Sequence, residues 1–289
     1  MRFALVNSGL GVLAAAAELR RLRPDADLVL AIDPDGMPWG PRSPDDIAKR
    51  SLICAEAAAR YEPDVLVFAC NTASVHALSA LRAEFEPAIP VVGTVPAIKP
   101  AAAAGEPVAI WATAATTGSR YQHDLIAQFA SGVAVTEVAC PGLADAIDAG
   151  DEDTISAGVA AGAAKTPADV RAIVLGCTEY ELIGDQIRAA RPGIRLNGSA
   201  PAVAAQALRR ASGREPAAAD GTGPGTAGSG GTAGSGGPAA ADAPPDPEPA
   251  GQAALHVLLS GRRADLPAAA LRYREGRFLA AQAPAGSAG

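Results

Sequence analysis

Two of the four cysteines stand where an apolar run ends. Cys70 closes the run 65–69, and Cys177 follows the run 172–175 after a single glycine. Continuous apolar runs of this length are typical of strands that are buried on both faces of a parallel sheet. In open α/β sheets, ligands bind beyond the carboxyl ends of the strands, so the sequence predicts two thiols at ligand-binding edges. Polar side chains follow both thiols: Asn71, Thr72, Thr178 and Glu179.

A pair of thiols facing each other across a cleft suits one class of reaction. Inversion of a stereocentre by proton transfer needs a base on one face of the α-carbon and an acid on the other. A thiolate and a thiol can alternate in these roles without a cofactor. Because a free cysteine with a pKa of about 8.5 is mostly protonated at neutral pH, neighbouring groups must tune both thiols. The other cysteines, Cys54 and Cys140, are expected to be small buried hydrophobic residues.

Composition and charge argue against several other classes of protein. The chain has 289 residues and a net charge of −7 without a Lys/Arg cluster, which argues against nucleic-acid binding. No apolar run approaches the ~20 residues of a membrane span. Four dispersed cysteines without a C-x-x-C pair, and three histidines, predict neither a disulfide framework nor a metal site. The first apolar run is interrupted at 7–9, so no secretion signal is expected and the chain is predicted to be cytoplasmic.

Apolar runs alternate with helix-type segments along most of the chain. Strands are expected at about 3–6, 28–32, 65–69, 91–92, 108–111, 133–138, 172–175 and 195–196. Helices are expected at about 11–22, 45–61, 74–85, 119–130, 142–164 and 180–190. Regular alternation of strand and helix predicts an α/β protein with parallel sheets.

The two halves of the chain resemble each other. Residues 93–97 match 198–202 at a shift of 105, and the run ending in Cys70 matches the run ending in Cys177 at a shift of 107. The strand expected at 3–6 corresponds to the one at 108–111. Landmarks in one order at nearly one spacing predict two pseudo-symmetric, doubly wound parallel-sheet domains that face each other across a cleft.

The expected domain boundaries follow from this repeat. The first α/β domain is expected at 1–95 and the second at 96–212. Residues 213–250 are of low complexity, with Thr-Ala-Gly-Ser-Gly-Gly occurring twice in tandem, and are predicted to be a disordered Gly/Ser/Pro/Ala linker. The segment of about 251–280 is expected to return to the first domain, with a short helix at 253–259.

Five motifs occur in the order in which a known family has them. They are Asn7-Ser8-Gly9, Pro38-Trp39-Gly40-Pro41-Arg42-Ser43, Ala69-Cys70-Asn71-Thr72-Ala73, Thr113-Ala114-Ala115-Thr116-Thr117-Gly118-Ser119-Arg120-Tyr121 and Leu175-Gly176-Cys177-Thr178-Glu179-Tyr180. With them, residues 2–210 resemble the glutamate racemases of the cofactor-independent aspartate/glutamate racemase superfamily. The two cysteine motifs at this separation are highly specific together, whereas either alone is weak.

The resemblance implies roles for residues in these motifs. Cys70 and Cys177 would be the acid/base pair that interconverts L-glutamate and D-glutamate, with no cofactor and no metal. The substrate would be bound by Ser8, Trp39, Gly40, Asn71, Thr72, Thr113, Thr116, Ser119 and Thr178. The resemblance also implies a bacterial cytoplasmic isomerase that supplies D-glutamate for peptidoglycan, and members of this family commonly form homodimers.

Three positions depart from the family pattern. The family's Asp beside the first thiol is Asn7 here, and an amide orients a substrate or a thiol but does not exchange protons. The family's His beside the second thiol is Glu179, as in the aspartate-racemase branch, and an ionised carboxylate can take the proton from Cys177 while raising the pKa of that thiol. The family's Tyr is Trp39. Asn7 and Glu179 remain candidate catalytic residues, and aspartate or another amino acid remains an alternative substrate.

Two other functions stay open on the sequence. Gly9, Gly11 and Ala14 fit the G-x-G-x-x-A fingerprint, and Asp33 stands near the position of a ribose-binding acid, which together suggest a dinucleotide-binding oxidoreductase. That function explains neither cysteine motif nor the repeat. Asn7 is compatible with a non-catalytic amino-acid-binding paralogue.

Overall fold

Short apolar runs form the strands in the computed structural model, which describes residues 1–213 and 253–282. The first sheet has the strand order β10-β9-β2-β1-β3-β4, and its strands are parallel except for the β9–β10 hairpin. Their bounds are β1 Arg2–Asn7, β2 Asp27–Ile32, β3 Val65–Phe68, β4 Val91–Val92, β9 Leu255–Leu259 and β10 Arg262–Ala264. The helices between these strands are α1 Val12–Leu22, α2 Pro44–Ala59, α3 Asn71–His76 and α4 Leu78–Phe85.

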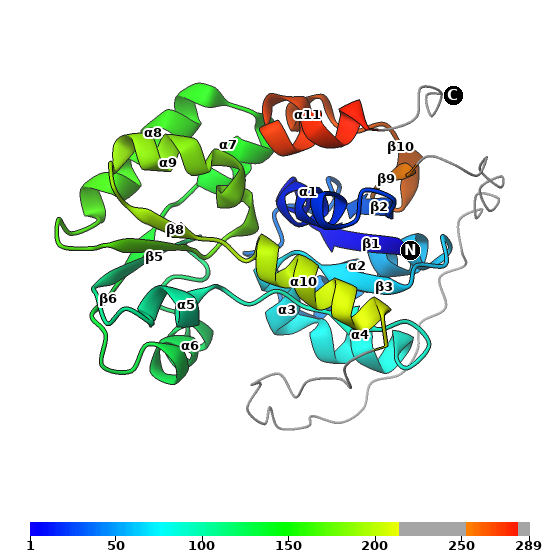
Figure 1. The fold of residues 1–289 in the computed structure, drawn as a ribbon, viewed down its shortest axis with the longest axis horizontal. Helices are drawn as coiled ribbons and strands as arrows, with labels where there is room; N and C mark the ends of the chain where they lie inside the picture. Colours follow the sequence, from blue (N-terminus) through cyan, green and yellow to red (C-terminus); the bar gives the residue numbers. More distant parts are fainter. Residues whose placement is uncertain (214–252, 283–289) are drawn as a thin grey trace.

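The second sheet is parallel throughout and has the order β6-β5-β7-β8. Its strands are β5 Val108–Ala112, β6 Val135–Ala139, β7 Ala172–Leu175 and β8 Arg195–Asn197. The helices that surround it are α5 Ile98–Ala102, α6 Arg120–Phe129, α7 Leu143–Ala149, α8 Glu152–Lys165, the 3₁₀ helix η1 Thr178–Ile183, and α9 Gly184–Ala190. Figure 1 shows this sheet and its helices as one lobe beside the lobe that contains β1.

The two sheets share one connectivity. The order β2-β1-β3-β4 in the first sheet is repeated as β6-β5-β7-β8 in the second. Strand β3 therefore corresponds to β7, and Cys70 and Cys177 follow these two strands at equivalent places. This confirms the prediction of an α/β protein with two pseudo-symmetric parallel-sheet domains.

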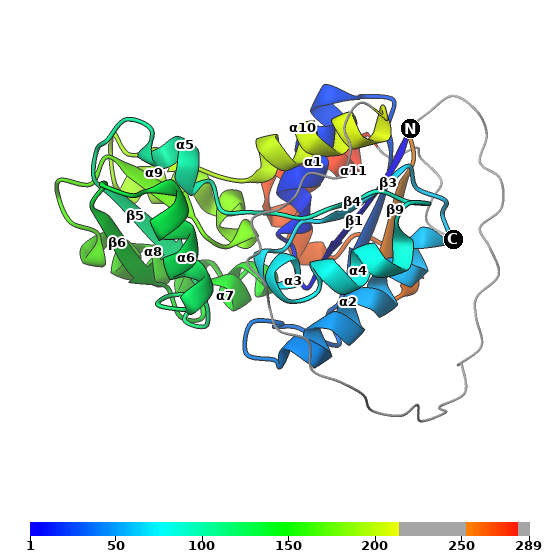
Figure 2. The same cartoon turned by 90° about the horizontal axis from the view of Figure 1, so that it is seen from below.

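Alternate residues of the central strand β1 face different cores, as a doubly wound sheet requires. Phe3 and Leu5 pack in the core on one face, and Ala4 and Val6 pack in the core on the other. Helix α1 covers the first face together with α10 (Ala200–Ala211) and α11 (Arg274–Ala281), and α2, α3 and α4 cover the second face (Figures 1 and 2). Because both faces are covered, β1 reads as a continuous apolar run.

The chain passes between the lobes more than once. Helix α10 follows β8 of the second sheet, yet it packs against α1 and β3 of the first domain. The helix expected at 74–85 begins at Asn71 and is divided at Ala77 into α3 and α4.

The prediction of a helix at 253–259 is wrong. Residues 255–259 form strand β9, which pairs in parallel with β2 and places Val257 opposite Leu30. The outer edge of β2 presents backbone N–H and C=O groups that need partners, and pairing with them outweighs the local preference for a helix. Apart from Gly213, the predicted linker 213–250 lies outside the described residues. Among residues 1–213 and 253–282, none of the helices combines the length and the apolar composition of a transmembrane segment.

Candidate active site

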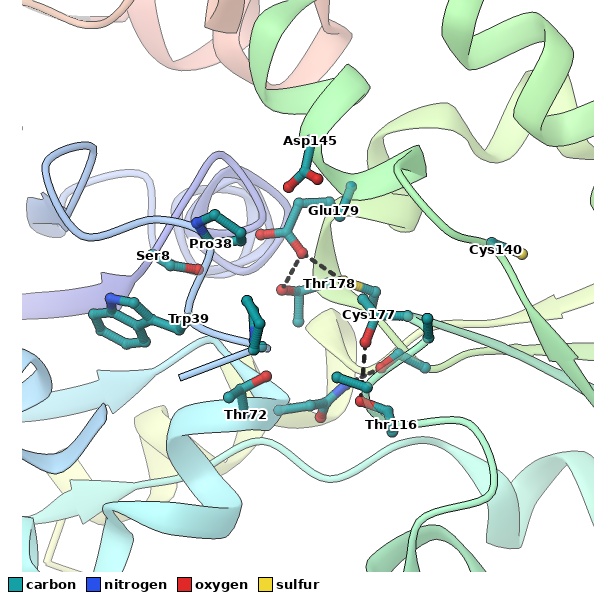
Figure 3. Close-up of a pocket in the computed structure, with 18 of the residues that line it drawn as sticks. Ser8, Pro38, Trp39, Thr72, Thr116, Cys140, Asp145, Cys177, Thr178 and Glu179 are labelled. Carbon is teal, nitrogen blue, oxygen red and sulfur yellow. Dashed lines mark hydrogen bonds between the residues drawn. The ribbon is translucent and has the colours of Figure 1, made fainter. Parts of the chain in front are cut away.

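A cavity of about 240 Å³ lies where the carboxyl ends of the two sheets meet (Figure 3). Both domains contribute to its wall, including Cys70 and Cys177. Other lining residues are Ser8, Pro38, Trp39, Gly40, Asn71, Thr72, Thr113, Thr116, Cys140, Asp145, Asp148, Gly176, Thr178 and Glu179. The structure thus places Cys70 and Cys177 at the carboxyl ends of strands of two different sheets and brings both thiols to one cavity.

Cys70 stands at the N-terminus of α3, between the end of β3 and the first helical turn. Burial, followed by the negative charge of Glu179, raises the pKa of the Cys70 thiol to about 11. Backbone N–H groups of Ser8, Thr72 and Ala73 act in the opposite direction and lower this pKa. These N–H groups would stabilise the sulfur once it loses its proton.

Cys177 occupies the equivalent place after β7, where it precedes η1. Its Sγ donates a hydrogen bond to Oε2 of Glu179 at 2.8 Å. Burial, and then the charge and hydrogen bond of Glu179, raise the pKa of this thiol well above its ordinary value. The proton on Cys177 therefore has an acceptor within hydrogen-bond reach.

The Glu179 carboxylate has donors from both domains. In addition to the Cys177 thiol, Oε2 accepts a hydrogen bond from Thr178 Oγ1 at 3.3 Å, and Oε1 accepts one from the Gly11 N–H at 3.3 Å. Figure 3 shows the bonds from Cys177 and Thr178 as dashed lines. These hydrogen bonds hold the carboxylate between the two domains, within reach of the Cys177 thiol.

Asn7 lies behind the cavity and not on its wall. Its side chain is fully buried, and Nδ2 donates to the Ala69 carbonyl at 2.7 Å and to Thr178 Oγ1 at 3.1 Å. The structure thus places this candidate catalytic residue as a link between the first domain and the motif of the second thiol.

The segment 38–41 forms one end of the cavity, but the Trp39 indole turns away from Cys177 (Figure 3). Trp39 is only 1% exposed, and its Nε1 donates to Oδ2 of the buried Asp33 at 2.9 Å. Arg50 forms an ion pair with the same oxygen at 3.0 Å. Trp39 thus anchors the loop that carries Gly40.

The predicted hydroxyl and amide residues are mostly brought together. Asn71 Nδ2 donates across the domains to the Gly176 carbonyl at 2.8 Å, whereas its buried Oδ1 has no hydrogen-bond partner and is available to a ligand. Thr113 and Thr116 share a hydrogen bond of 3.2 Å on the cavity wall. Ser119 is an exception, because it caps α6 by accepting from the Gln122 N–H at 3.2 Å and does not line the cavity.

Sequence reasoning missed two carboxylates on α7. Asp145 and Asp148 both line the cavity, and Asp148 Oδ1 accepts a hydrogen bond from the Leu10 N–H at 2.6 Å. Burial, and then the charge of Glu179, raise the pKa of Asp148 well above its ordinary value. Two acids three residues apart on a helix normally mark a solvated face, so the sequence carried no sharper signal.

The charge of the wall restricts the ligand. The described residues that line the cavity include three carboxylates but no Lys, Arg or His. Carboxylates of a bound molecule must therefore be held by hydroxyl, amide and backbone N–H groups, while an ammonium group would find negative partners. Both features fit a free amino acid.

The glycine turn after β1 is occupied by protein. A Cβ on Gly9 would overlap the Asp148 carboxylate, and one on Gly11 would overlap Thr178 and Glu179. These side chains fill the place where the pyrophosphate of a dinucleotide would lie. Asp33 is occupied as well, since it binds Trp39 and Arg50. The two glycines instead allow the domains to approach each other closely.

Two like α/β domains each direct one thiol into a shared cavity, and this arrangement defines the class of protein to which the chain can be compared. The model for the Asp/Glu/Hydantoin racemase family matches residues 6–207. The chain belongs to this family and is therefore a racemase, an isomerase.

Named relatives agree with this assignment. A glutamate racemase of Roseiflexus sp. (strain RS-1) is 41% identical over 206 residues, covering 69% of this chain and 75% of the relative. A glutamate racemase of Salmonella gallinarum is 38% identical over 207 residues, which cover 68% of this chain and 72% of the relative. Escherichia coli glutamate racemase, solved with L-glutamate and the activator UDP-MurNAc-ala, has 32% identity and a TM-score of 0.68 over 76% of this chain and 86% of its own. The structure of glutamate racemase from Thermus thermophilus has 27% identity and a TM-score of 0.58, and the match covers 75% of this chain and 83% of that enzyme.

Proposed function

We propose that this chain interconverts L-glutamate and D-glutamate by proton transfer between Cys70 and Cys177, without a cofactor. The observation that carries the proposal is that one cavity is lined by a thiol from the end of β3 and a thiol from the end of β7. Relatives named glutamate racemase, at 41% and 38% identity, support glutamate as the substrate.

The reaction needs one deprotonated and one protonated thiol. In one direction a thiolate takes the α-proton, the electron pair delocalises into the carboxylate, and the opposite thiol delivers its proton to the other face of the carbon. At Cys177, Glu179 accepts the thiol proton before the thiolate acts. At Cys70, three backbone N–H groups stabilise the thiolate. The ammonium of the bound amino acid supplies a positive charge that lowers the pKa of both thiols.

Substrate binding is assigned to the neutral donors and the carboxylates of the wall. The substrate carboxylates are held by Ser8, Gly40, Thr72, Thr113 and Thr116. The unpartnered Oδ1 of Asn71 accepts from the substrate ammonium, and the Thr178 hydroxyl orients Glu179. The ammonium is assigned to the carboxylates of the wall, among which Asp148 and Glu179 interact with each other.

The biological setting follows from the family resemblance. We place the enzyme in the bacterial cytoplasm, where it supplies D-glutamate for peptidoglycan and cell-wall biogenesis. Its partners are the amino-acid substrate and, as in related racemases, a second copy of the chain in a homodimer; neither nucleic acid nor a membrane takes part.

Aspartate is the second candidate substrate, because Glu179 stands where glutamate racemases have His and where the aspartate-racemase branch has Glu. A shorter dicarboxylic acid would use the same neutral donors. The two substrates are therefore best separated by experiment.

Exchange of the α-proton in deuterated water tests the proposal directly. We expect deuterium at the α-carbon of L- and D-glutamate, more slowly or not at all with aspartate. Replacing Cys70 or Cys177 by Ala should abolish racemisation, whereas Cys54→Ala, a buried thiol in α2 outside the cavity, should leave it intact. Absence of exchange with every amino acid would favour a non-catalytic binding protein, and full activity of a Cys70→Ala protein would exclude the two-thiol mechanism.

A further inference from the structure

The segment that follows residue 252 contacts both domains. Strand β9 pairs with β2 in the first sheet, and α11 packs against α1, next to α7 in Figure 1. The 3₁₀ helix η2 (Ala268–Arg272) contacts α7 of the second domain. There the Arg272 side chain lies over Gly150, the left-handed residue that ends α7, so closely that a Cβ on Gly150 would be 2.6 Å from its Cδ. The segment thus reaches the helix that carries Asp148.

One side chain of this segment bonds directly to α7. Tyr273 is 7% exposed, and its hydroxyl donates to the Ile147 carbonyl at 2.6 Å. The last carbonyls of a helix have no partner within the helix, and α7 has only 7 residues. Gly150 N–H bonds to the same carbonyl at 3.0 Å. The Tyr273 hydroxyl therefore adds a tertiary hydrogen bond to the last turn of α7, which has few backbone hydrogen bonds of its own.

Asp148 is the next residue after Ile147. Its carboxylate accepts from the Leu10 N–H at 2.6 Å and lines the cavity beside Glu179. Burial, and then the charges of Asp148 and Glu152, raise the pKa of Tyr273 to about 12. Asp148 lies in the last turn of this short helix, so the position of its carboxylate depends on how firmly that turn is held. Small displacements of a group at a reacting centre lower the reaction rate by large factors.

We propose that Tyr273 is a positioning residue of the racemase site: its hydroxyl fixes the last turn of α7, so that Asp148 stays on the cavity wall next to Glu179. The C-terminal segment is then part of the scaffold of the active site, although no motif of the cysteine pattern lies in it. This inference rests on the racemase activity proposed above, and it assigns Tyr273 no contact with the substrate.

A double-mutant cycle separates this role from a general structural one. The full-length wild type, Tyr273→Phe, Asp148→Asn and the double variant are assayed for racemisation of glutamate. We expect Tyr273→Phe to lower kcat about three- to tenfold, the factor that corresponds to one hydrogen bond, with a much smaller change in KM. In the Asp148→Asn background the same change should have little further effect, because coupled residues are not additive.

The possible outcomes are distinct. The same loss in both backgrounds would show that Tyr273 acts independently of Asp148 and would overturn the inference, as would an unchanged kcat of Tyr273→Phe in the wild-type background. A wild-type protein that exchanges no α-proton would instead refute the proposed function.

Two further measurements keep the test decisive. Tyr61→Phe removes the hydroxyl of a buried tyrosine of the first domain and should leave kcat unchanged. If Asp148→Asn is too slow to assay, a crystal structure of Tyr273→Phe decides: we expect the bond between Asp148 and the Leu10 N–H to be lost, and its retention would overturn the inference.

Discussion

Asn7 Nδ2 donates a hydrogen bond to Thr178 Oγ1 at 3.1 Å, joining the end of β1 to the motif of the second thiol. Because the Thr178 oxygen accepts from Asn7, its own hydrogen is directed to Glu179 Oε2 at 3.3 Å. Nδ2 also donates to the Ala69 carbonyl at 2.7 Å, which fixes the orientation of the amide. Asn7 and Glu179, the two departures from the family pattern beside the thiols, are therefore connected through Thr178.

This connection predicts that Asn7→Asp lowers activity. The ionised carboxylate that this substitution introduces cannot donate to the Ala69 carbonyl and would accept the Thr178 hydrogen, which removes a donor from Glu179. We expect kcat for glutamate to fall by about tenfold, as when one charge-assisted hydrogen bond is lost. Circular-dichroism assays of both enantiomers measure the effect.

The double variant Asn7→Asp/Glu179→His supplies the control, since it restores the pair that the family has at these positions. It should be more active than Asn7→Asp alone. An Asn7→Asp protein as active as the wild type would show that the direction of the Thr178 hydrogen bond is irrelevant.

Glu179→Gln should shift the titration of both thiols. The negative charge of Glu179 raises the pKa of Cys70 and of Cys177, so its removal lowers both pKa values and moves the pH dependence of alkylation to lower pH. At the same time kcat should fall by ~10² or more, because Cys177 loses its proton acceptor. Mass spectrometry of iodoacetamide-treated protein between pH 7 and about 11 resolves the two cysteines.

Glu137→Gln is the matched control for this charge, since it removes a carboxylate of the second domain outside the cavity. Its alkylation profile should equal that of the wild type. Unchanged midpoints in Glu179→Gln would mean that burial alone sets the pKa of the thiols.

Asp148→Asn should stabilise the fold above neutral pH. The folded protein holds the Asp148 proton more tightly than the unfolded chain, whose ordinary pKa is 3.8, so this group contributes stability at low pH that is lost as pH rises through the raised pKa. The side-chain amide of the Asp148→Asn variant does not titrate, so this variant does not lose stability as the pH rises. We expect a Tm about 2–4 °C above wild type at pH 8, for a gain of about 1 kcal/mol, and a difference that shrinks toward pH 4.

Scanning calorimetry across this range measures the shift, with Asp145→Asn on the exposed part of the same helix as the control. A Tm for Asp148→Asn below that of the wild type at pH 8 would show that the bond to the Leu10 N–H outweighs the cost of burying the charge.

What the sequence could predict was set by patterns along the chain. Apolar runs and the internal repeat predicted both sheets, and the two cysteine motifs predicted the centre of the cavity. Strand β9 was missed because its stabilisation comes from the edge of β2, which lies far away in the sequence. Asp148 was missed for the same kind of reason, since its role depends on the approach of Leu10.

The same limit explains two residues of the family motifs whose side chains are used differently from what the resemblance suggested. Ser119 satisfies the N-terminus of α6, a local need that competes for any serine at that position. The Trp39 indole finds a buried acceptor, Asp33, on the side away from the cavity. A motif specifies where the backbone passes, whereas the direction of a side chain depends on the partners that the fold provides.

The bond between Trp39 and Asp33 predicts a specific kinetic effect. Trp39→Phe keeps an aromatic ring but removes the N–H that bonds to the Asp33 carboxylate at 2.9 Å. Because this bond holds the loop that brings Gly40 to the cavity wall, we expect KM for glutamate to rise about tenfold, the factor for a hydrogen bond of ~1.5 kcal/mol to a charged group, with kcat changed far less. Trp111→Phe is the matched control: it removes the buried bond to Thr166 Oγ1, also 2.9 Å, away from the cavity wall, and should lower Tm without changing KM. An equal rise of KM in both variants would show that loss of stability, and not the position of the loop, weakens binding.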